Sequence, residues 1–333
     1  MIDLHLHLDG SLSEQDFKYL AEKDHISLGD DFPNNIYVPA DCPSLADYLK
    51  RFDLPCRLLQ SEENLIYATK SLVTRLYKLG LIYAEIRFAP QLHTLKGLSQ
   101  MEVTRSVIRG LKEGLKLCPG FDANIILCCM RHSDEKTNIE TIEVANKLKG
   151  DKVCGVDLAG DEVLHPSSYY KNVFELAKQY KLNITIHAGE ATGSDEIMMA
   201  IDNGAKRIGH GVHLSLDNKT IDRVVENNIC FEFCPTSNLQ TKSLSSYKSV
   251  PLKDFIKHNI KVTINSDNMT VSNTDVNREM KIMINTFKLT KEEVEILLLN
   301  SINSSFSSLK TKRILKQLLS ERLDNYYKKM FEI

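Results

Sequence analysis

The stretch Asp3-Leu4-His5-Leu6-His7-Leu8-Asp9-Gly10 alternates polar and apolar residues with a period of two. This alternation predicts a β-strand that carries His5 and His7 on one face and leucines on the other. Neutral imidazole is a good ligand for zinc-like ions, so two histidines on one strand face provide half of a metal site. An accidental pair, or two histidines hydrogen-bonded inside a core, would show the same spacing. Residues further along the chain decide between these interpretations.

Seven further short β-rich runs follow, with helical segments between them. Two of these segments, Tyr169–Lys181 and Ser194–Asn203, have amphipathic spacing and good helix formers. Strand and helix alternating eight times predicts an α/β fold of the (β/α)8 barrel type, a TIM barrel. An open doubly wound sheet would carry a glycine-rich phosphate motif after a strand, and the sequence contains none. The predicted strands are Met1–His7, Ile82–Ala89, Ala123–Met130, Val153–Ala159, Asn183–His187, Arg207–His210, Cys230–Cys234 and Lys261–Asn265.

Two segments depart from the simple repeat, and we expect both to belong to a single barrel domain over residues 1–333. The connection between the first two predicted strands is longer than one crossover helix requires. Within it lies an insertion at about 30–80, with helical runs at Ser44–Phe52 and Glu62–Leu79. It emerges at the carboxyl rim of the barrel, where it either covers the mouth as a helical lid or serves only packing. At the other end, a C-terminal helical segment is expected at about 288–333.

Composition restricts the possible partners. The 333 residues include 42 Lys plus Arg and 44 Asp plus Glu, a formal net charge of −2, which gives no argument for nucleic acid or an anionic membrane. No apolar run approaches membrane-spanning length, and no signal peptide precedes the first strand, so a cytoplasmic protein is expected. Eight cysteines form no C-x-x-C and are expected to be buried, reduced thiols rather than metal ligands. The sequence does not define an oligomeric state.

Unusual polar residues collect where the predicted strands end. His5 and His7 lie near the end of the first strand, His187 ends the fifth, His210 ends the sixth, and Asp267 follows the eighth. The carboxyl ends of barrel strands form the active-site face, so these side chains should converge. One histidine at a strand end is more often a core residue than a ligand. Four histidines and an aspartate on one predicted face indicate a metal site.

The residue types suggest what such a site would do. Three histidines and a carboxylate bind a divalent ion and leave a position open for water, as in a catalytic site. The metal lowers the pKa of bound water from ~15.7 to about 7, which supplies hydroxide at neutral pH. Glu190, three residues after His187, is either a general acid in a closed pocket or a loop glutamate favoured by a helix dipole. His210 is either a fourth ligand or a group that orients or deprotonates the water. These features predict a mononuclear metal hydrolase without naming its substrate.

Seven segments together resemble the adenosine deaminase family of the amidohydrolase superfamily. They occur in the family's order and span residues 3–268, so the resemblance covers nearly the whole predicted barrel. A lone H-x-H is a weak signal, whereas this ordered set is specific. The segments are His5-Leu6-His7-Leu8-Asp9-Gly10-Ser11, Ala84-Glu85-Ile86-Arg87-Phe88-Ala89-Pro90, Val156-Asp157-Leu158-Ala159-Gly160-Asp161-Glu162, His187-Ala188-Gly189-Glu190, Gly209-His210-Gly211, Cys234-Pro235-Thr236-Ser237-Asn238 and Asn265-Ser266-Asp267-Asn268.

The resemblance implies zinc-dependent hydrolytic deamination of adenosine, and of 2′-deoxyadenosine, to inosine and ammonia. It implies that Glu190 protonates purine N1 while metal-bound hydroxide attacks C6. His210 would position the attacking water and share in its deprotonation, and Asp267 would also accept a hydrogen bond from it. One Zn²⁺ per subunit would be held by His5, His7, His187 and Asp267.

The resemblance also places His7, Asp9, Gly160 and Asn268 against the purine nucleoside, the expected small-molecule partner. The backbone N–H of Gly160 would meet purine N3, and Asp9 would hydrogen-bond the ribose 5′-hydroxyl. Asn268 stands where animal members often carry aspartate to bind purine N7. Because N7 is an acceptor, an asparagine amide can donate to it and an ionised aspartate cannot.

Several alternatives stay open at the level of sequence. Adenine deaminases tend to carry glutamate in place of Asp9, and a free base has no ribose hydroxyl, so Asp9 favours a nucleoside substrate. Another purine-type amidohydrolase, or one that hydrolyses a lactone or amide, would use the same hydroxide. A silent binding protein that kept the fold would not need Glu190. Base-flipping polynucleotide deaminases use H-x-E with P-C-x-x-C, and neither occurs here.

Overall fold

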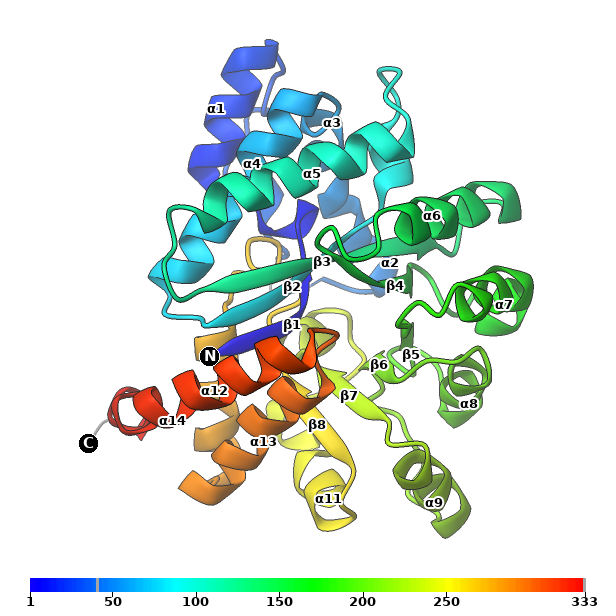
Figure 1. Ribbon diagram of the computed structural model, residues 1–333, viewed down its shortest axis with the longest axis vertical. Helices are drawn as coiled ribbons and strands as arrows, with labels where there is room; N and C mark the ends of the chain where they lie inside the picture. The colour runs from blue at the N-terminus through cyan, green and yellow to red at the C-terminus, as the bar shows by residue number, and fades with distance from the viewer. Residues whose placement is uncertain (40–41, 332–333) are drawn as a thin grey trace.

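Eight parallel strands form the wall of a barrel and follow one another in chain order (Figure 1). The computed structural model describes residues 1–39 and 42–331. Strands β1 to β4 form one hydrogen-bonded sheet and β5 to β8 another. Each observed strand begins and ends within two residues of its predicted bounds. The strands are β1 (Ile2–His7), β2 (Tyr83–Phe88), β3 (Asp122–Met130), β4 (Val153–Ala159), β5 (Thr185–Ala188), β6 (Arg207–His210), β7 (Cys230–Phe233) and β8 (Lys261–Ile264).

Backbone hydrogen bonds at two seams close the two sheets into one barrel. At the first seam, the N–H of Val156 in β4 donates to the carbonyl of Asn183, just before β5, at 2.9 Å. At the second, the N–H of Asp267 donates to the carbonyl of His5, and the N–H of His7 donates to the carbonyl of Asp267, each at 2.8 Å. Closure therefore brings the segment after β8 directly against the two histidines of β1. The predicted (β/α)8 barrel is confirmed.

Helices surround this barrel on the outside (Figure 1). In α5 (Gln100–Leu115), Ser99 and Glu102 form a capping box, and Val107 and Leu111 recur one turn apart and are buried. Asp134 and Asp217 cap the first turns of two later helices with their side chains. The helices that connect later strands are α6 (Glu135–Lys147), α7 (Lys171–Gln179), α8 (Ser194–Asp202), α9 (Asn218–Glu226), α10 (Pro235–Gln240) and α11 (Leu252–Lys257).

The long connection between β1 and β2 is helical, as predicted. It contains α1 (Glu14–Asp24), α2 (Leu45–Leu49), α3 (Asp53–Leu58) and α4 (Glu62–Lys78). The helix α1 lies before the expected insertion, and α4 packs against α5 as the outer helix of this part of the barrel. Residues 40–41 of the predicted lid lie outside the described residues.

Glycine permits the close approach of α4 and α5. A Cβ at Gly110 of α5 would lie 2.4 Å from the carbonyl oxygen of Ile66, and one at Gly114 would lie 2.7 Å from a methyl of Val73. Both distances are shorter than van der Waals contact, so larger residues would push the two helices apart.

Three helices complete the chain after β8: α12 (Val276–Phe287), α13 (Lys291–Ser304) and α14 (Leu309–Phe331). The helices α13 and α14 fall within the C-terminal helical segment predicted at about 288–333, whereas α12 precedes it; residues 332–333 lie outside the described residues. Helix α13 lies against β8 and β1. Short 3-10 helices occupy Asp9–Ser11 (η1), Asn34–Ile36 (η2), Lys50–Phe52 (η3), Pro90–His93 (η4), Ser167–Tyr170 (η5) and Tyr247–Ser249 (η6). Within the described ranges, no helix has both the length and the apolar character to cross a membrane.

Candidate active site

The four predicted metal ligands meet at the carboxyl ends of β1, β5 and β8. The Nε2 atoms of His7 and His187 lie 3.3 Å apart. Asp267 Oδ1 lies 3.4 Å from His7 Nε2 and 3.5 Å from His5 Nε2. The candidate ligand atoms of His5, His7 and His187 all lie within 4.8 Å of one another. His210 belongs to a second such group with His5 and Asp267, so the structure brings together all five predicted metal-site residues.

Unusual backbone conformations produce this convergence. His210 and Asp267 have φ values of 62° and 59°, in the left-handed region that side chains other than glycine seldom adopt. Such conformations cluster at functional sites, where the surrounding structure enforces them. Gly209, which precedes His210, leaves room for the imidazoles, because a Cβ there would lie 3.0 Å from His5 Cε1 and 3.2 Å from His187 Cα.

Two buried carboxylates contact the Nδ1 atoms of two candidate ligands, His5 and His187. Glu232 Oε2 lies 2.8 Å from His5 Nδ1, and Asp157 Oδ2 lies 3.0 Å from His187 Nδ1. Arg87 links the two carboxylates, at 2.9 Å from Asp157 and 2.8 Å from Glu232. This arrangement places the proton of each imidazole on Nδ1 and turns Nε2 toward the centre of the site.

The same contacts determine whether Glu232 and Asp157 are ionised. Burial alone would raise the pKa of Glu232, but the guanidinium groups of Arg87 and Arg207 hold it well below the usual range. Burial also opposes ionisation of Asp157, but His187 and Arg87 keep its pKa well below the usual value. Both carboxylates are therefore ionised and accept the imidazole N–H groups.

His5 supplies the direct test of whether the residues fit a metal ion. Its side chain is fully buried, and its Nε2 has no hydrogen-bond partner among the residues that the structure describes. Burial, helped by Arg87 and His187, lowers its pKa to about 4, so the ring is neutral. A neutral imidazole whose Nδ1 donates to Glu232 offers the lone pair of Nε2. Three imidazole nitrogens, from His5, His7 and His187, and one carboxylate oxygen of Asp267 suit a divalent cation, and the donor set fits a metal.

Glu190 lies beside this group in the segment after β5. Thr241 Oγ1 donates to its Oε1 at 3.0 Å, and Asn238 Nδ2 reaches the same oxygen at 3.4 Å. Oε2 lies 3.5 Å from His210 Nε2. Burial raises the pKa of Glu190; His210 opposes the shift, and Asp267 and Glu162 add to it. A carboxyl group with a raised pKa keeps its proton at higher pH, as a general acid requires.

The same groups line a cavity of about 590 Å³, a suitable size for a small molecule. Every predicted site residue lines it except His5, which is fully buried. Leu45, Tyr48 and Phe52 show that the insertion contributes to its wall. Further lining side chains that the sequence did not single out are Leu49, Asp53, Cys56, Gln91, Leu92, Leu95, Cys128, Met130, His132, Leu164, His165 and Thr241.

Asn268 has a partner that the sequence gave no reason to expect. Its Nδ2 donates to Tyr48 Oη at 2.9 Å, and Tyr48 Oη also lies 2.7 Å from Ser272 Oγ. Because an amide nitrogen carries two hydrogens, one remains for a ligand. A Cβ at Gly10 would lie 1.9 Å from Asn268 Oδ1, so glycine is required there.

Asp9 and Gly160 also border the cavity. Asp9 is 5% exposed, and burial raises its pKa to about 6. Gly160 has a φ of 108°, which only glycine adopts without strain. The structure thus brings all the predicted site residues together. The sequence analysis did not identify the residues that contact them. Asp157 lay within a quoted motif, but Tyr48, Thr241 and Glu232 gave no comparable signal.

A parallel (β/α)8 barrel with histidine and aspartate donors at the carboxyl ends of its strands defines an enzyme of the amidohydrolase class. The family described as adenosine deaminase matches residues 1–322. The chain is 41% identical over 330 residues to an adenosine deaminase of Haemophilus ducreyi, covering 97% of this chain and 96% of that protein. It is 41% identical over 325 residues to one of Clostridium botulinum, covering 96% and 97%.

Among solved structures, an adenine deaminase from Arthrobacter aurescens shares the fold with a TM-score of 0.87. It is 24% identical, and the alignment covers 97% of this chain and 98% of that one. The extent of the family match and the identity to curated relatives show that the chain belongs to the adenosine deaminase family. This membership supports hydrolytic deamination of adenosine as its reaction.

Proposed function

We propose that the chain deaminates adenosine and 2′-deoxyadenosine with one bound zinc ion. The observation that carries the proposal is the meeting of His5, His7, His187 and Asp267 beside the buried carboxyl of Glu190. His5, His7, His187 and Asp267 would hold the ion. When bound, zinc would supply an activated water for attack at purine C6.

Glu190 is the proposed acid. Attack at C6 interrupts the aromaticity of the ring, so N1 must receive a proton in the same step. Because Oε1 already accepts hydrogen bonds from Thr241 and Asn238, the proton of Glu190 belongs on Oε2. From there it can be donated to N1.

His210 is proposed to orient the attacking water and to share in its deprotonation. Its surroundings differ from those of the ligand histidines. Its Nδ1 faces the amide of Asn238 at 3.0 Å, whereas His5 and His187 each face a carboxylate. Its Nε2 lies 3.5 Å from Glu190 Oε2, a proximity that supports the proposal of a shared role in proton transfer.

The cavity favours an uncharged nucleoside. No lysine or arginine lines it among the residues that the structure describes, so a nucleotide phosphate would lack a cationic partner there. Asp9 would bind the ribose 5′-hydroxyl, the Gly160 N–H would meet purine N3, and Asn268 would donate to N7. His7 would contact the substrate as well as the ion. The insertion helices α2 and α3, which contribute to the cavity wall, would form the lid.

The compartment proposed for this enzyme is the cytoplasm. All eight cysteines are unpaired, and six of them are buried. Free thiols persist where the surroundings are reducing.

Metal removal and replacement test the zinc part of the proposal. Protein stripped with a chelator should lose adenosine deamination, and one equivalent of zinc per chain, verified by elemental analysis, should restore it. A calcium-treated sample controls for unspecific effects of a divalent ion. Full activity in metal-free protein would overturn the zinc assignment.

A further inference from the structure

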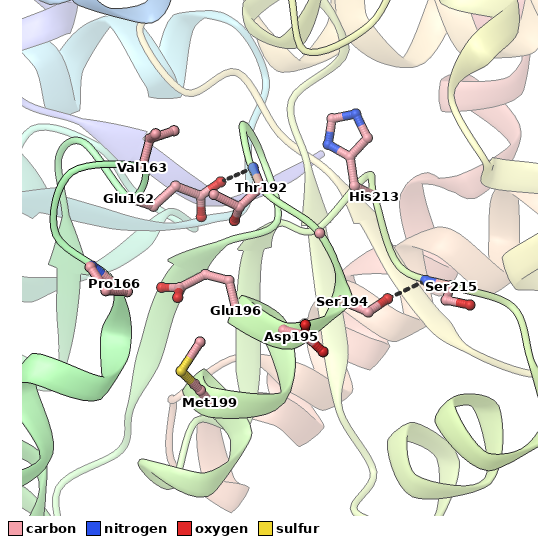
Figure 2. A pocket seen from close by; sticks show the side chains of 11 residues that line it. Glu162, Val163, Pro166, Thr192, Ser194, Asp195, Glu196, Met199, His213 and Ser215 are labelled. Carbon is pink, nitrogen blue, oxygen red and sulfur yellow. Dashed lines mark hydrogen bonds between the residues drawn. The ribbon is translucent and has the colours of Figure 1, made fainter.

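Glu162 is a buried carboxylate outside the proposed chemistry. It follows β4, and its side chain is 3% exposed. It accepts three backbone hydrogen bonds from the segment after β5: from Gly189 at 2.8 Å, Ala191 at 2.5 Å and Thr192 at 2.8 Å. Figure 2 shows the bond to Thr192. Glu162 does not line the catalytic cavity; it lines a neighbouring pocket of about 550 Å³.

The three donors enclose Glu190 on both sides. Gly189 precedes it, and Ala191 and Thr192 follow it. Residues 189–193 form neither helix nor strand, so no regular hydrogen-bond pattern fixes them. Their N–H groups instead converge on one carboxylate, and hydrogen bonds to an ionised acceptor are shorter and stronger than neutral ones.

The backbone of this segment turns at a glycine, which adopts a positive φ without strain. Gly189 has a φ of 69°, and a Cβ there would lie 2.5 Å from the side chain of Ile197. The chain therefore turns sharply between His187, a proposed ligand, and Glu190, the proposed acid. The direction in which the Glu190 carboxyl points depends on how firmly this turn is held.

We propose that Glu162 is the positioning residue for the catalytic acid, holding the backbone on both sides of Glu190 so that its carboxyl faces the reacting purine. This inference rests on the proposed function. Glu162 does not line the substrate cavity, and its hydrogen bonds go to the backbone segment that carries Glu190. It sets an orientation, and small displacements of a catalytic group have large effects on rate.

Glu196 offers a matched control. It borders the same pocket, and it is also 3% exposed (Figure 2). Its hydrogen bonds go to Ser167, at 2.8 and 3.1 Å from the backbone N–H, and it pairs with Arg131 at 2.9 Å. Glu196→Gln therefore removes a buried charge nearby without releasing the turn around Glu190.

The test is a double-mutant cycle. In Glu162→Gln, an amide group faces N–H donors where a carboxylate oxygen accepted them, so the turn loosens while side-chain volume is kept. We expect kcat for adenosine to fall on the order of 10-fold or more, with KM within about twofold and metal content unchanged. In the Glu190→Gln background the same change should have no further effect, since there is no acid left to position. Glu196→Gln, at equal loss of thermal stability, should not lower kcat in this way.

The outcomes distinguish failure of the positioning role of Glu162 from failure of Glu190 as the acid. An equal loss of kcat from Glu162→Gln in both backgrounds would overturn the positioning role and leave Glu190 as the acid. A rise in KM at unchanged kcat would do the same. Normal turnover of Glu190→Gln by itself would instead refute the proposed acid, and the positioning role with it. If Glu162→Gln does not fold, Glu162→Ala tests the same cycle, because water in the neighbouring pocket can reach the released N–H groups.

Discussion

His7 Nε2 lies 3.3 Å from His187 Nε2, although 180 residues separate them in the chain. One belongs to the first strand and the other to the fifth, and only closure of the barrel brings them together. Burial lowers the pKa of His7 well below its usual value, so this imidazole is neutral. Two imidazole nitrogens that face each other beside Asp267 form a site that a divalent cation would stabilise.

Replacement of Asp267 by alanine should release the metal. The ion would lose a carboxylate whose Oδ1 lies within 3.5 Å of the Nε2 atoms of both His5 and His7. We expect metal content per chain and adenosine turnover to fall together, measured by elemental analysis and by an activity assay. Asp254→Ala, at an exposed position on α11, should leave both unchanged. A fully active, metal-replete Asp267→Ala variant would exclude this residue as a ligand.

Glu190→Gln should separate metal binding from catalysis. Glutamine keeps the side-chain volume but cannot donate the proton of a carboxylic acid to N1. The metal should remain, and kcat should fall by a factor on the order of 10² or more. Turnover at the wild-type rate would remove Glu190 from the mechanism.

Asp9→Ala should weaken binding of the ribose rather than of the base. We expect KM for adenosine to rise on the order of 10-fold, as for loss of a hydrogen bond to a charged group. KM for 5′-deoxyadenosine, which lacks the hydroxyl, should change little. The assignment is wrong if both substrates lose affinity to the same extent.

Tyr48→Phe should affect recognition of purine N7 through Asn268. Phenylalanine keeps the ring but removes the oxygen that accepts from Asn268 Nδ2 and contacts Ser272. The amide is then free to rotate, and loss of about 1 kcal/mol would raise KM for adenosine roughly fivefold. KM for 7-deazaadenosine, which has no N7 acceptor, serves as the control and should stay constant. A parallel rise for both compounds would point to a purely structural role of Tyr48.

Asp9 also predicts a pH dependence of stability. Its pKa is raised from 3.8 to about 6 by burial, so the folded state holds a proton that the unfolded state has already released between these values. The free energy of unfolding therefore decreases as pH rises through this window. Asp9→Asn lacks this titration, so its stability relative to wild type should increase by about 3 kcal/mol between pH ~4 and pH ~8. Denaturant unfolding across this range measures the difference, which would be constant if Asp9 titrated normally.

The barrel, and the convergence of the candidate metal-site residues at one rim, could be predicted from sequence because both follow from local patterns. The period-two alternation around His5 and His7 defines a strand and its inward face, and strand ends in a barrel share one rim. The helix α1 was not predicted, although Ser13 and Asp16 form a capping box at its start.

The surroundings of the site could not be predicted, because they depend on contacts between distant segments. Tyr48 meets Asn268 across 220 residues, and Glu232 meets His5 across 227. Nothing in the local sequence of Tyr48 distinguishes it from a tyrosine that packs in a helix. Glu162 lay within a family motif, but only the folded turn after β5 shows what its carboxylate holds.

The most direct measurement of the central claim is the ultraviolet absorbance change on conversion of adenosine to inosine by the purified, zinc-loaded protein, with adenine and AMP in parallel. The proposed site predicts turnover of adenosine, abolished by a chelator and absent in Glu190→Gln, and little or none of the other two. Turnover of adenine alone would contradict the account and assign the cavity to the free base.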